Sequence, residues 1–135
     1  MTVTYTNQPV QQINTTWNAD PTAIGLTPVL NNACTTGATH GDKFVNSGHE
    51  FIYVLNGASA SDLVVTINDQ SDCDHGFNHS VIANLAPSVG RMLGPFPLNW
   101  FMNPCLITYS GDVTGSPTIA IFQLPFPYAG TLNIG

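Results

Sequence analysis

The sequence predicts an all-β protein, a single-domain β-sandwich of jelly-roll type with extended N- and C-terminal arms. Short runs rich in β-branched and aromatic residues recur along the chain. Gly and Pro, 12 and 10 of the 135 residues, punctuate the junctions between these runs. No stretch of helical length keeps a 3.6-residue period. A hydrophobic content of 43% in a chain of this size is sufficient for one core.

The predicted sandwich domain covers residues 21–124, between an N-terminal arm at 1–20 and a C-terminal arm at 125–135. Its strands are recognised as apolar runs that are bounded by turn residues. Including one run near the N-terminus, we expect strands at residues 2–6, 22–30, 51–55, 63–67, 80–85, 90–96, 105–110 and 118–124.

The clearest pattern is a predicted β-hairpin over residues 48–69. Its first strand is apolar on both faces, whereas its second strand alternates apolar and polar positions. Asn56-Gly57, followed by small residues, is a typical chain-reversal signal. From the period of two in the apolar strands we expect a core that includes Phe51, Tyr53, Leu55, Val65, Ile67, Ile107, Ile119 and Ile121.

The two arms differ in composition from the predicted domain. Residues 7–21 are mostly polar and show no period, although they include Trp17. Residues 125–135 contain two prolines that favour an extended backbone. They also carry four large apolar side chains, Phe126, Tyr128, Leu132 and Ile134. We therefore expect both arms, the C-terminal one above all, to contribute more to binding a partner or a second subunit than to folding.

Charged side chains are scarce, at 7% of residues, and the net charge is −6. A surface of hydroxyls and amides suits a subunit that is docked in an assembly. Lys43 and Arg91, the two cations, form no basic stripe, which argues against nucleic-acid binding. No apolar run has the length of a membrane span, and residues 1–10 lack the pattern of a signal peptide. We expect synthesis and retention in a cytoplasm, with no membrane partner.

The densest cluster of chemically active groups lies in segment 68–80, which contains Asp69, Asp72, Cys73, Asp74, His75 and His79. Imidazole and carboxylate groups are usual metal ligands. The histidine spacing fits a zinc motif only on a helix, however, and the glycine and asparagine of this segment favour a loop. We expect a polar loop that binds neither a metal nor another cofactor.

Catalytic patterns are also missing from the sequence. There is no nucleophile elbow of the form GxSxG. Cys34, Cys73 and Cys105 are odd in number and show no CxxC spacing, so we interpret them as free thiols. Glu50, at the start of a predicted strand, is expected to be an edge or pairing residue rather than a general base. The sequence therefore indicates no catalytic residue and no enzyme.

One aromatic pair lies in a loop that is bracketed by prolines. Trp100 and Phe101, followed by Met102, could pack back as a lid on the core. They could instead protrude as interface anchors, because Trp and Met are enriched at such sites. The candidate partner-binding residues are thus Trp17, Trp100, Phe101, Met102, Phe126, Tyr128, Leu132 and Ile134.

Three stretches carry a resemblance to a known group of proteins: "GDKFVNSGHEFIYVLNGASASDLVVTI" from residue 41, "CDHGFNHSVIANLAPSVGRMLGPFP" from residue 73 and "CLITYSGDVTGSPTIAIFQL" from residue 105. Together they resemble the small head-decoration (cement) proteins of tailed bacteriophages. The resemblance covers roughly residues 41–124, and its most specific element is residues 91–97. It departs from the pattern at 85–90, and residues 125–135 extend beyond it.

The resemblance implies a non-enzymatic virion protein on the outer surface of the capsid, made in the host cytoplasm. Its partner would be the major capsid protein, which it would bind as a homotrimer or other homo-oligomer. One alternative is a small β-domain of a phage tail, neck or fibre. A second, from a different class, is a carbohydrate-binding jelly-roll module that stacks sugars on Trp17 or Trp100.

Overall fold

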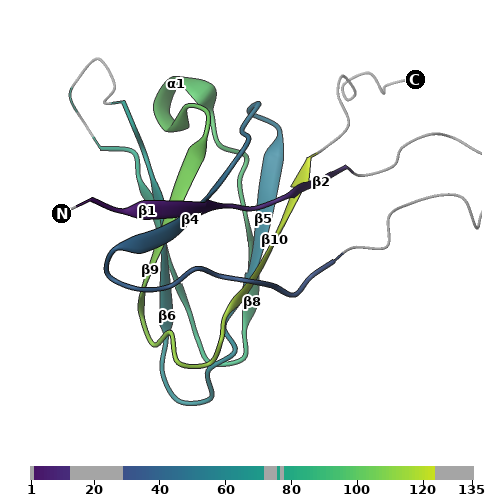
Figure 1. Ribbon diagram of the computed structural model, residues 1–135, viewed down its shortest axis with the longest axis vertical. Coiled ribbons are helices and arrows are strands. Elements are labelled where there is room, and N and C mark those ends of the chain that lie inside the picture. Colours follow the sequence, from purple (N-terminus) through teal and green to yellow (C-terminus); the bar gives the residue numbers. More distant parts are fainter. Residues whose placement is uncertain (1, 13–28, 72–75, 77, 124–135) are drawn as a thin grey trace, which may run out of the picture.

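The computed structural model describes residues 2–12, 29–71, 76 and 78–123, which form an all-β sandwich (Figure 1). The described elements are β1 (Thr4–Asn7), β2 (Val10–Gln12), β3 (Asn32–Ala33), β4 (His40–Phe44), β5 (Glu50–Leu55), β6 (Leu63–Asn68), β7 (Val81–Leu85), β8 (Gly90–Leu93), α1 (Leu98–Phe101), β9 (Cys105–Gly111) and β10 (Thr118–Gln123). Within the described ranges, no helix is long or apolar enough to cross a membrane.

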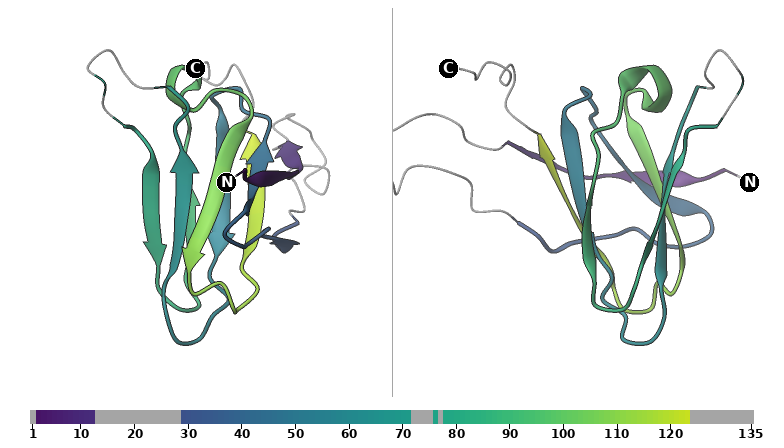
Figure 2. Two further views of the ribbon diagram at one scale, coloured as in Figure 1. Left: turned by 60° about the vertical axis from the view of Figure 1, so that its left-hand side comes forward. Right: turned by 180° about the vertical axis from the view of Figure 1, so that it is seen from behind.

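The strands form two layers that face each other (Figures 1 and 2). The first sheet has the order β1-β4-β9-β6-β7, and the second has the order β2-β10-β5-β8, with β3 also pairing with β10. Strands β1 and β2 pair in parallel with β4 and β10, and the remaining pairs are antiparallel. Strands β3 to β10 thus give the orders β3-β10-β5-β8 and β4-β9-β6-β7, which are compatible with jelly-roll connectivity.

The predicted hairpin over residues 48–69 is wrong, because β5 and β6 belong to different sheets. β5 pairs with β8 and β10, whereas β6 pairs with β7 and β9. Residues 56–62 cross from one sheet to the other, a gap of about 10 Å in packed sheets. Buried Asn56 fixes this corner: its Nδ2 donates to the carbonyl oxygens of Ser61 (3.1 Å) and Leu85 (2.9 Å), and its Oδ1 accepts from the amide of Ala58 (2.9 Å).

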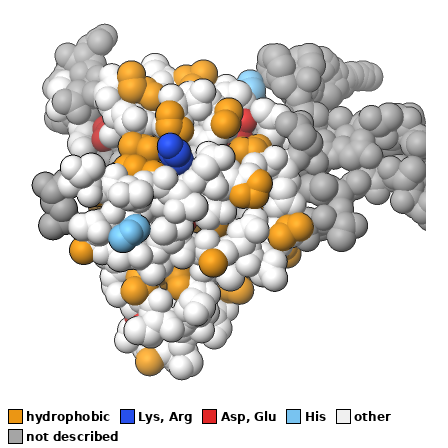
Figure 3. All heavy atoms as spheres, viewed as in Figure 1, with side chains coloured by type: hydrophobic (Ala, Val, Ile, Leu, Met, Phe, Trp, Pro, Cys, Tyr) orange, Lys and Arg blue, Asp and Glu red, His pale blue; other side chains and the backbone are white. Residues whose placement is uncertain are grey.

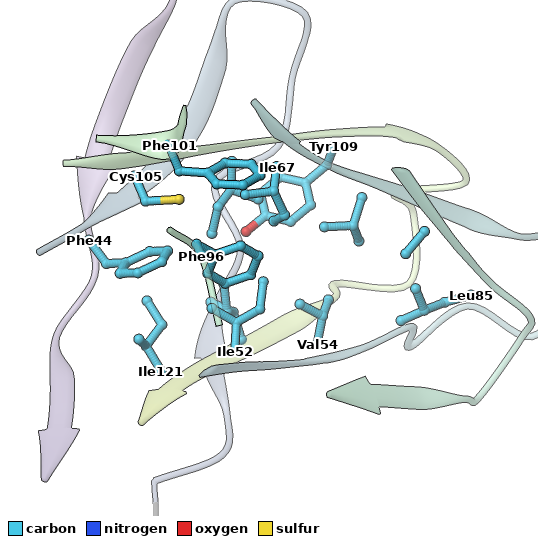
Figure 4. Close-up of a cluster of buried hydrophobic side chains, with 14 of the residues drawn as sticks. Phe44, Ile52, Val54, Ile67, Leu85, Phe96, Phe101, Cys105, Tyr109 and Ile121 are labelled. Carbon is cyan, nitrogen blue, oxygen red and sulfur yellow. The ribbon is translucent and has the colours of Figure 1, made fainter. Parts of the chain in front are cut away.

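The core fills the space between the two sheets (Figure 4). At the end near α1 it contains three phenylalanines from different elements. The Phe96 ring lies 6.0 Å from that of Phe44 and 5.4 Å from that of Phe101, the latter in a T-shaped arrangement. Each buried side chain of this size contributes about 1.5–3 kcal/mol through removal of apolar surface from water.

Five of the eight predicted core residues are confirmed as fully or almost fully buried: Val65, Ile67, Ile107, Ile119 and Ile121. The other three, Phe51, Tyr53 and Leu55, were assigned to the wrong face of β5. In the structure Ile52 and Val54 point into the core, while these three are half-buried on the outer face. The strand is apolar on both faces, so alternation alone does not identify the inner one.

Strand β4 is an element that the sequence patterns did not reveal. Two of its inward positions are Asp42 and Phe44, both fully buried, and the aspartate hides the apolar alternation. Gly41 allows a close approach of neighbouring strands, since a Cβ there would lie 2.4 Å from the carbonyl oxygen of Ile107 and 2.9 Å from the Tyr5 ring. Gly41 and Asp42 thus occupy positions of β4 where alternating apolar residues would have indicated a strand.

The predicted N-terminal arm, residues 1–20, is partly built into the sandwich. β1 extends the edge of the first sheet and β2 the edge of the second, so residues 4–12 run across both layers. This corrects the expectation of a separate arm over that range. Residues 13–20 and 125–135 lie outside the described residues. Most of the predicted strand at 22–30 does too, and its last two residues, Val29 and Leu30, are exposed and not in a strand.

Candidate interaction surface

The end of the sandwich that carries α1, here called the apical end, contains three of the candidate partner-binding residues (Figure 1). Phe101 is only 3% exposed and packs in the core against Phe96. It therefore belongs to the core and offers a partner no accessible ring face, which corrects its assignment as a contact residue. Met102, the next residue, is exposed.

Trp100 is partly buried against the core and also forms one side of a ring stack. The His79 ring lies 3.9 Å from it, at an interplanar angle of 10°. The amide of Gln70 donates to the Trp100 carbonyl oxygen (2.7 Å), and its side-chain amide donates to the carbonyl oxygens of Phe101 and Pro104. These bonds tie the start of the β6–β7 connection to α1, so Trp100 is held in place rather than protruding.

Asp69 fixes the other side of this stack. Its Oδ2 accepts the His79 amide (2.6 Å) and its Oδ1 accepts the Ser80 hydroxyl (2.9 Å). The bond from the His79 amide is the main reason that the pKa of the Asp69 carboxyl lies below its ordinary value. The His79 Nε2 atom is buried without a hydrogen-bond partner.

Exposed apolar side chains gather at the apical end, and only one of them, Met102, is predicted from the sequence as a contact residue. Val45, Leu98 and Met102 are 58%, 45% and 45% exposed. Asn46 links their segments, because its Nδ2 donates to the carbonyl oxygens of Phe96 and Met102, both at 3.0 Å. Its backbone amide also donates to the Oδ1 of Asn103 at 3.0 Å. The apical end is therefore a braced surface with apolar groups on it.

The remaining candidate contact residues are not placed by the structure. They are Trp17, Phe126, Tyr128, Leu132 and Ile134, which lie outside the described residues. Most of the polar cluster at 68–80 lies there too, namely residues 72–75. The described part of that segment connects β6 to β7, as expected for a loop between strands. Among the described residues, no group of three or more metal-ligating side chains comes together.

A buried carboxylate, Asp42, lies where the N-terminal segment crosses between the sheets. Its Oδ1 accepts from the side chain of Gln8 (3.0 Å), and its Oδ2 accepts from the Thr35 amide (2.9 Å) and the Tyr109 hydroxyl (2.7 Å). Gln8 donates in addition to the Ala33 carbonyl oxygen at 3.0 Å. Since both oxygens of Asp42 are occupied, the group fastens residues 8, 35 and 109 together rather than facing a substrate.

A second buried carboxylate, Glu50, begins the interior strand β5; of the two roles expected for it, edge residue or pairing residue, it has the second. Its Oε1 accepts the Ser47 and His49 amides at 2.7 and 3.2 Å. Its Oε2 accepts the Ser47 hydroxyl at 2.8 Å and the Gln123 side chain at 2.9 Å. The carboxylate holds the β4–β5 turn against the end of β10, which is a structural task.

The thiols of Cys34 and Cys105 are both free and poorly suited to nucleophilic chemistry. Burial raises the pKa of each to about 12. The thiolate is the reactive form of cysteine, so both groups stay protonated and inert at neutral pH. Burial also raises the pKa of the Tyr109 hydroxyl well above its ordinary value, with smaller contributions from Cys34 and Asp42.

The described surface carries very little charge, as the space-filling view shows on one face (Figure 3). The described acidic residues are Asp42, Glu50, Asp62, Asp69 and Asp112, and the first two of these are buried. Three acidic side chains and two basic ones are therefore left to face solvent in the described part. Burial of two acids makes the outside even less charged than the composition suggests.

Comparisons of this chain with protein-family models, with curated proteins and with solved structures find no match.

Proposed function

We propose that this chain is a non-enzymatic structural protein of a phage virion that binds and stabilises the outer surface of the assembled capsid. The observation that carries the proposal is the low charge on the surface of the described residues, where few charged side chains occur and two of the five described acids are buried in hydrogen-bond networks. Loss of charged side chains is typical of surfaces that become buried between subunits. The partner is the major capsid protein.

The motifs that resemble those of decoration proteins support this proposal, and in the structure their residues stabilise the β-sandwich. Gly41 and Asp42 bring strands together and fasten the N-terminal segment. In residues 91–97, Gly94 has a φ of 124°, a conformation that favours glycine, and Phe96 is buried in the core. These residues build the sandwich, and the contacts to a shell come from other positions.

We assign the shell contact to the apical end. Val45, Leu98 and Met102 are exposed there on segments that Asn46 braces. A braced apolar surface loses little conformational freedom on binding. A protein that binds the assembled shell, and not its separated subunits, stabilises the shell in proportion to its occupancy and affinity.

The test uses capsid shells that lack this chain. Purified wild-type protein is expected to sediment with the shells at a saturating stoichiometry and to raise their temperature of thermal disruption. Met102→Glu is expected to lower the affinity at least tenfold. The control is Val89→Glu, an exposed apolar residue in the β7–β8 turn, where the expected change is less than twofold. Absence of co-sedimentation by the folded wild-type protein would refute the proposal.

Two alternatives predict different outcomes. A tail, neck or fibre domain would bind purified tails and leave the shells bare in the same sedimentation assay. A carbohydrate-binding module would need an accessible aromatic platform, but one face of Trp100 is covered by the His79 ring. A glycan array with the purified protein tests that reading directly.

A further inference from the structure

The outer face of the second sheet carries large apolar side chains where a solvent-facing sheet normally carries polar ones. Here this surface is called the apolar outer face, and it comprises Phe51, Tyr53, Leu55, Met92 and Phe122. The register places Phe51 opposite Phe122 and Tyr53 opposite Met92, so the side chains of β5, β8 and β10 adjoin on one side. The residues that alternate with them along the strands, such as Ile52, point to the opposite side of the sheet and into the core.

Two small residues, Gly90 and Ala120, lie beside Tyr53 on this face. A Cβ at Gly90 would lie 2.1 Å from the Tyr53 hydroxyl oxygen, which means that the Tyr53 side chain extends across β8 at that glycine. Ala120, opposite Tyr53 on β10, is buried between larger neighbours. Met92 on the edge strand is 53% exposed. The apolar outer face therefore extends to the edge strand of the sheet.

The first sheet shows that this is not a general property of the chain. On its outer face Thr66 lies between Thr108 and Ile82, and Val64 lies between Ser110 and Asn84, so polar side chains alternate with aliphatic ones and no aromatic ring is present among these positions. Polar residues on the solvent side are the ordinary pattern for an antiparallel sheet with one buried face. The two outer faces therefore differ in chemistry within one molecule, and the apolar one needs a covering partner.

We propose that the apolar outer face binds the C-terminal segment, residues 125–135, of a second copy of this chain. That segment has no charged residue and carries four large apolar side chains, Phe126, Tyr128, Leu132 and Ile134. Burying this segment against an apolar surface therefore desolvates no charged side chain. Eleven residues reach up to about 36 Å when extended, well beyond the roughly 20 Å length of a six-residue strand.

The position and sequence of the segment favour a neighbouring copy over the segment's own sheet. It follows β10 almost directly, and Phe122 near the end of that strand belongs to the apolar outer face. To cover its own sheet, the chain would have to reverse sharply at this point. Pro125 and Pro127 bias themselves and the residues before them towards extended backbone, which disfavours such a reversal. Each copy thus offers one segment and one face, an arrangement that can close into a ring.

The test measures self-association of the full chain by analytical ultracentrifugation, without any shells, so that its outcome is separate from that of shell binding. Deletion of 125–135 and the face variant Met92→Glu are each expected to weaken association at least tenfold. The matched control is Ile82→Glu on edge strand β7, where Ile82 is 67% exposed on the outer face of the first sheet. There we expect less than a twofold change.

Mixing the two defective proteins identifies the occupant. The deletion variant keeps an intact face and Met92→Glu keeps an intact segment, so the mixture is expected to form heterodimers that neither forms alone. If the deletion variant fails to fold by circular dichroism, a labelled peptide of residues 125–135 is titrated against the wild type and Met92→Glu, with tenfold weaker binding expected for the latter. A concentration-independent monomer, or association that Met92→Glu abolishes and the deletion leaves intact, would overturn the proposal.

Discussion

Replacing Asp42 by asparagine probes the buried group that fastens the N-terminal segment to both sheets. The carboxylate accepts three hydrogen bonds, from Gln8, Thr35 and Tyr109, at 2.7–3.0 Å. An asparagine in the same place keeps one acceptor oxygen and turns an amide NH2 group towards at least one donor. A hydrogen bond to a charged group contributes about 1.5–3 kcal/mol, and an unsatisfied buried donor costs about 1–3 kcal/mol.

From these values we expect Asp42→Asn to lower the free energy of unfolding by about 2–4 kcal/mol. For a domain of this size, that corresponds to a fall in Tm on the order of 10 °C. The assay is urea unfolding followed by circular dichroism, with hydrogen exchange over residues 2–12 as the local readout. Asp62→Asn is the control, because Asp62 is exposed and the change in net charge is the same; we expect it to stay within about 0.5 kcal/mol of the wild type. If Asp42→Asn also stayed within that range, with unchanged exchange at 2–12, the assigned role of Asp42 would be wrong.

Three further predictions concern the buried groups. In a Cys73→Ser background, Cys34 and Cys105 are expected to resist alkylation at pH 8 in the native state and to react after unfolding, because burial raises the pKa of both to about 12; rapid native labelling would contradict this. The raised pKa of Tyr109 favours its neutral form in the folded state, so its contribution to stability is complete below pH of about 10 and is lost as the pH rises further. Tyr109→Phe should therefore flatten the decline in Tm at alkaline pH, and an unchanged decline would assign it to other groups. Ile52→Ala should lower the free energy of unfolding by about 2–5 kcal/mol, as for other fully buried side chains, and a loss below 1 kcal/mol would mean that it does not face the core.

Much of the fold could be predicted from the sequence because most strands show a simple apolar pattern. The all-β class and the positions of β6, β7, β9 and β10 follow from alternation between turn residues. Which strands pair does not follow, because pairing depends on contacts between residues that are distant in the chain. The chain does turn at Asn56-Gly57, as predicted. The turn leads from one sheet to the other rather than into a hairpin, and the side chain of buried Asn56 holds it in place.

The elements that were missed share a physical cause: polar residues that face inward. Asp42 in β4 and Gln8 before β2 are buried, and their hydrogen-bond partners come from other parts of the chain. A period-two search treats such residues as solvent-facing and so finds no strand at 40–44 and an arm at 1–20. The sequence did contain one indication of β4, because Phe44 lies two residues after Asp42 and therefore points to the same side of a strand.

The candidate contact residues were harder to find than the fold. The sequence predicts Trp100 and Phe101 in a loop, but both belong to α1, where Phe101 packs into the core and Trp100 stacks on His79. Val45 and Leu98 gave no signal as isolated apolar residues, because only the folded chain brings them to the same end as Met102. The sequence does indicate the apolar outer face, because β5 is apolar on both of its faces.

The most direct test of the central claim is a cryo-EM map of the purified particle that contains this chain. The account predicts that the β-sandwich fits density on the outer surface of the head, with the apical end and Met102 turned towards the major capsid protein. Residues 125–135 of each copy should lie on the apolar outer face of its neighbour. Density for the chain on the tail alone or inside the shell would contradict the account.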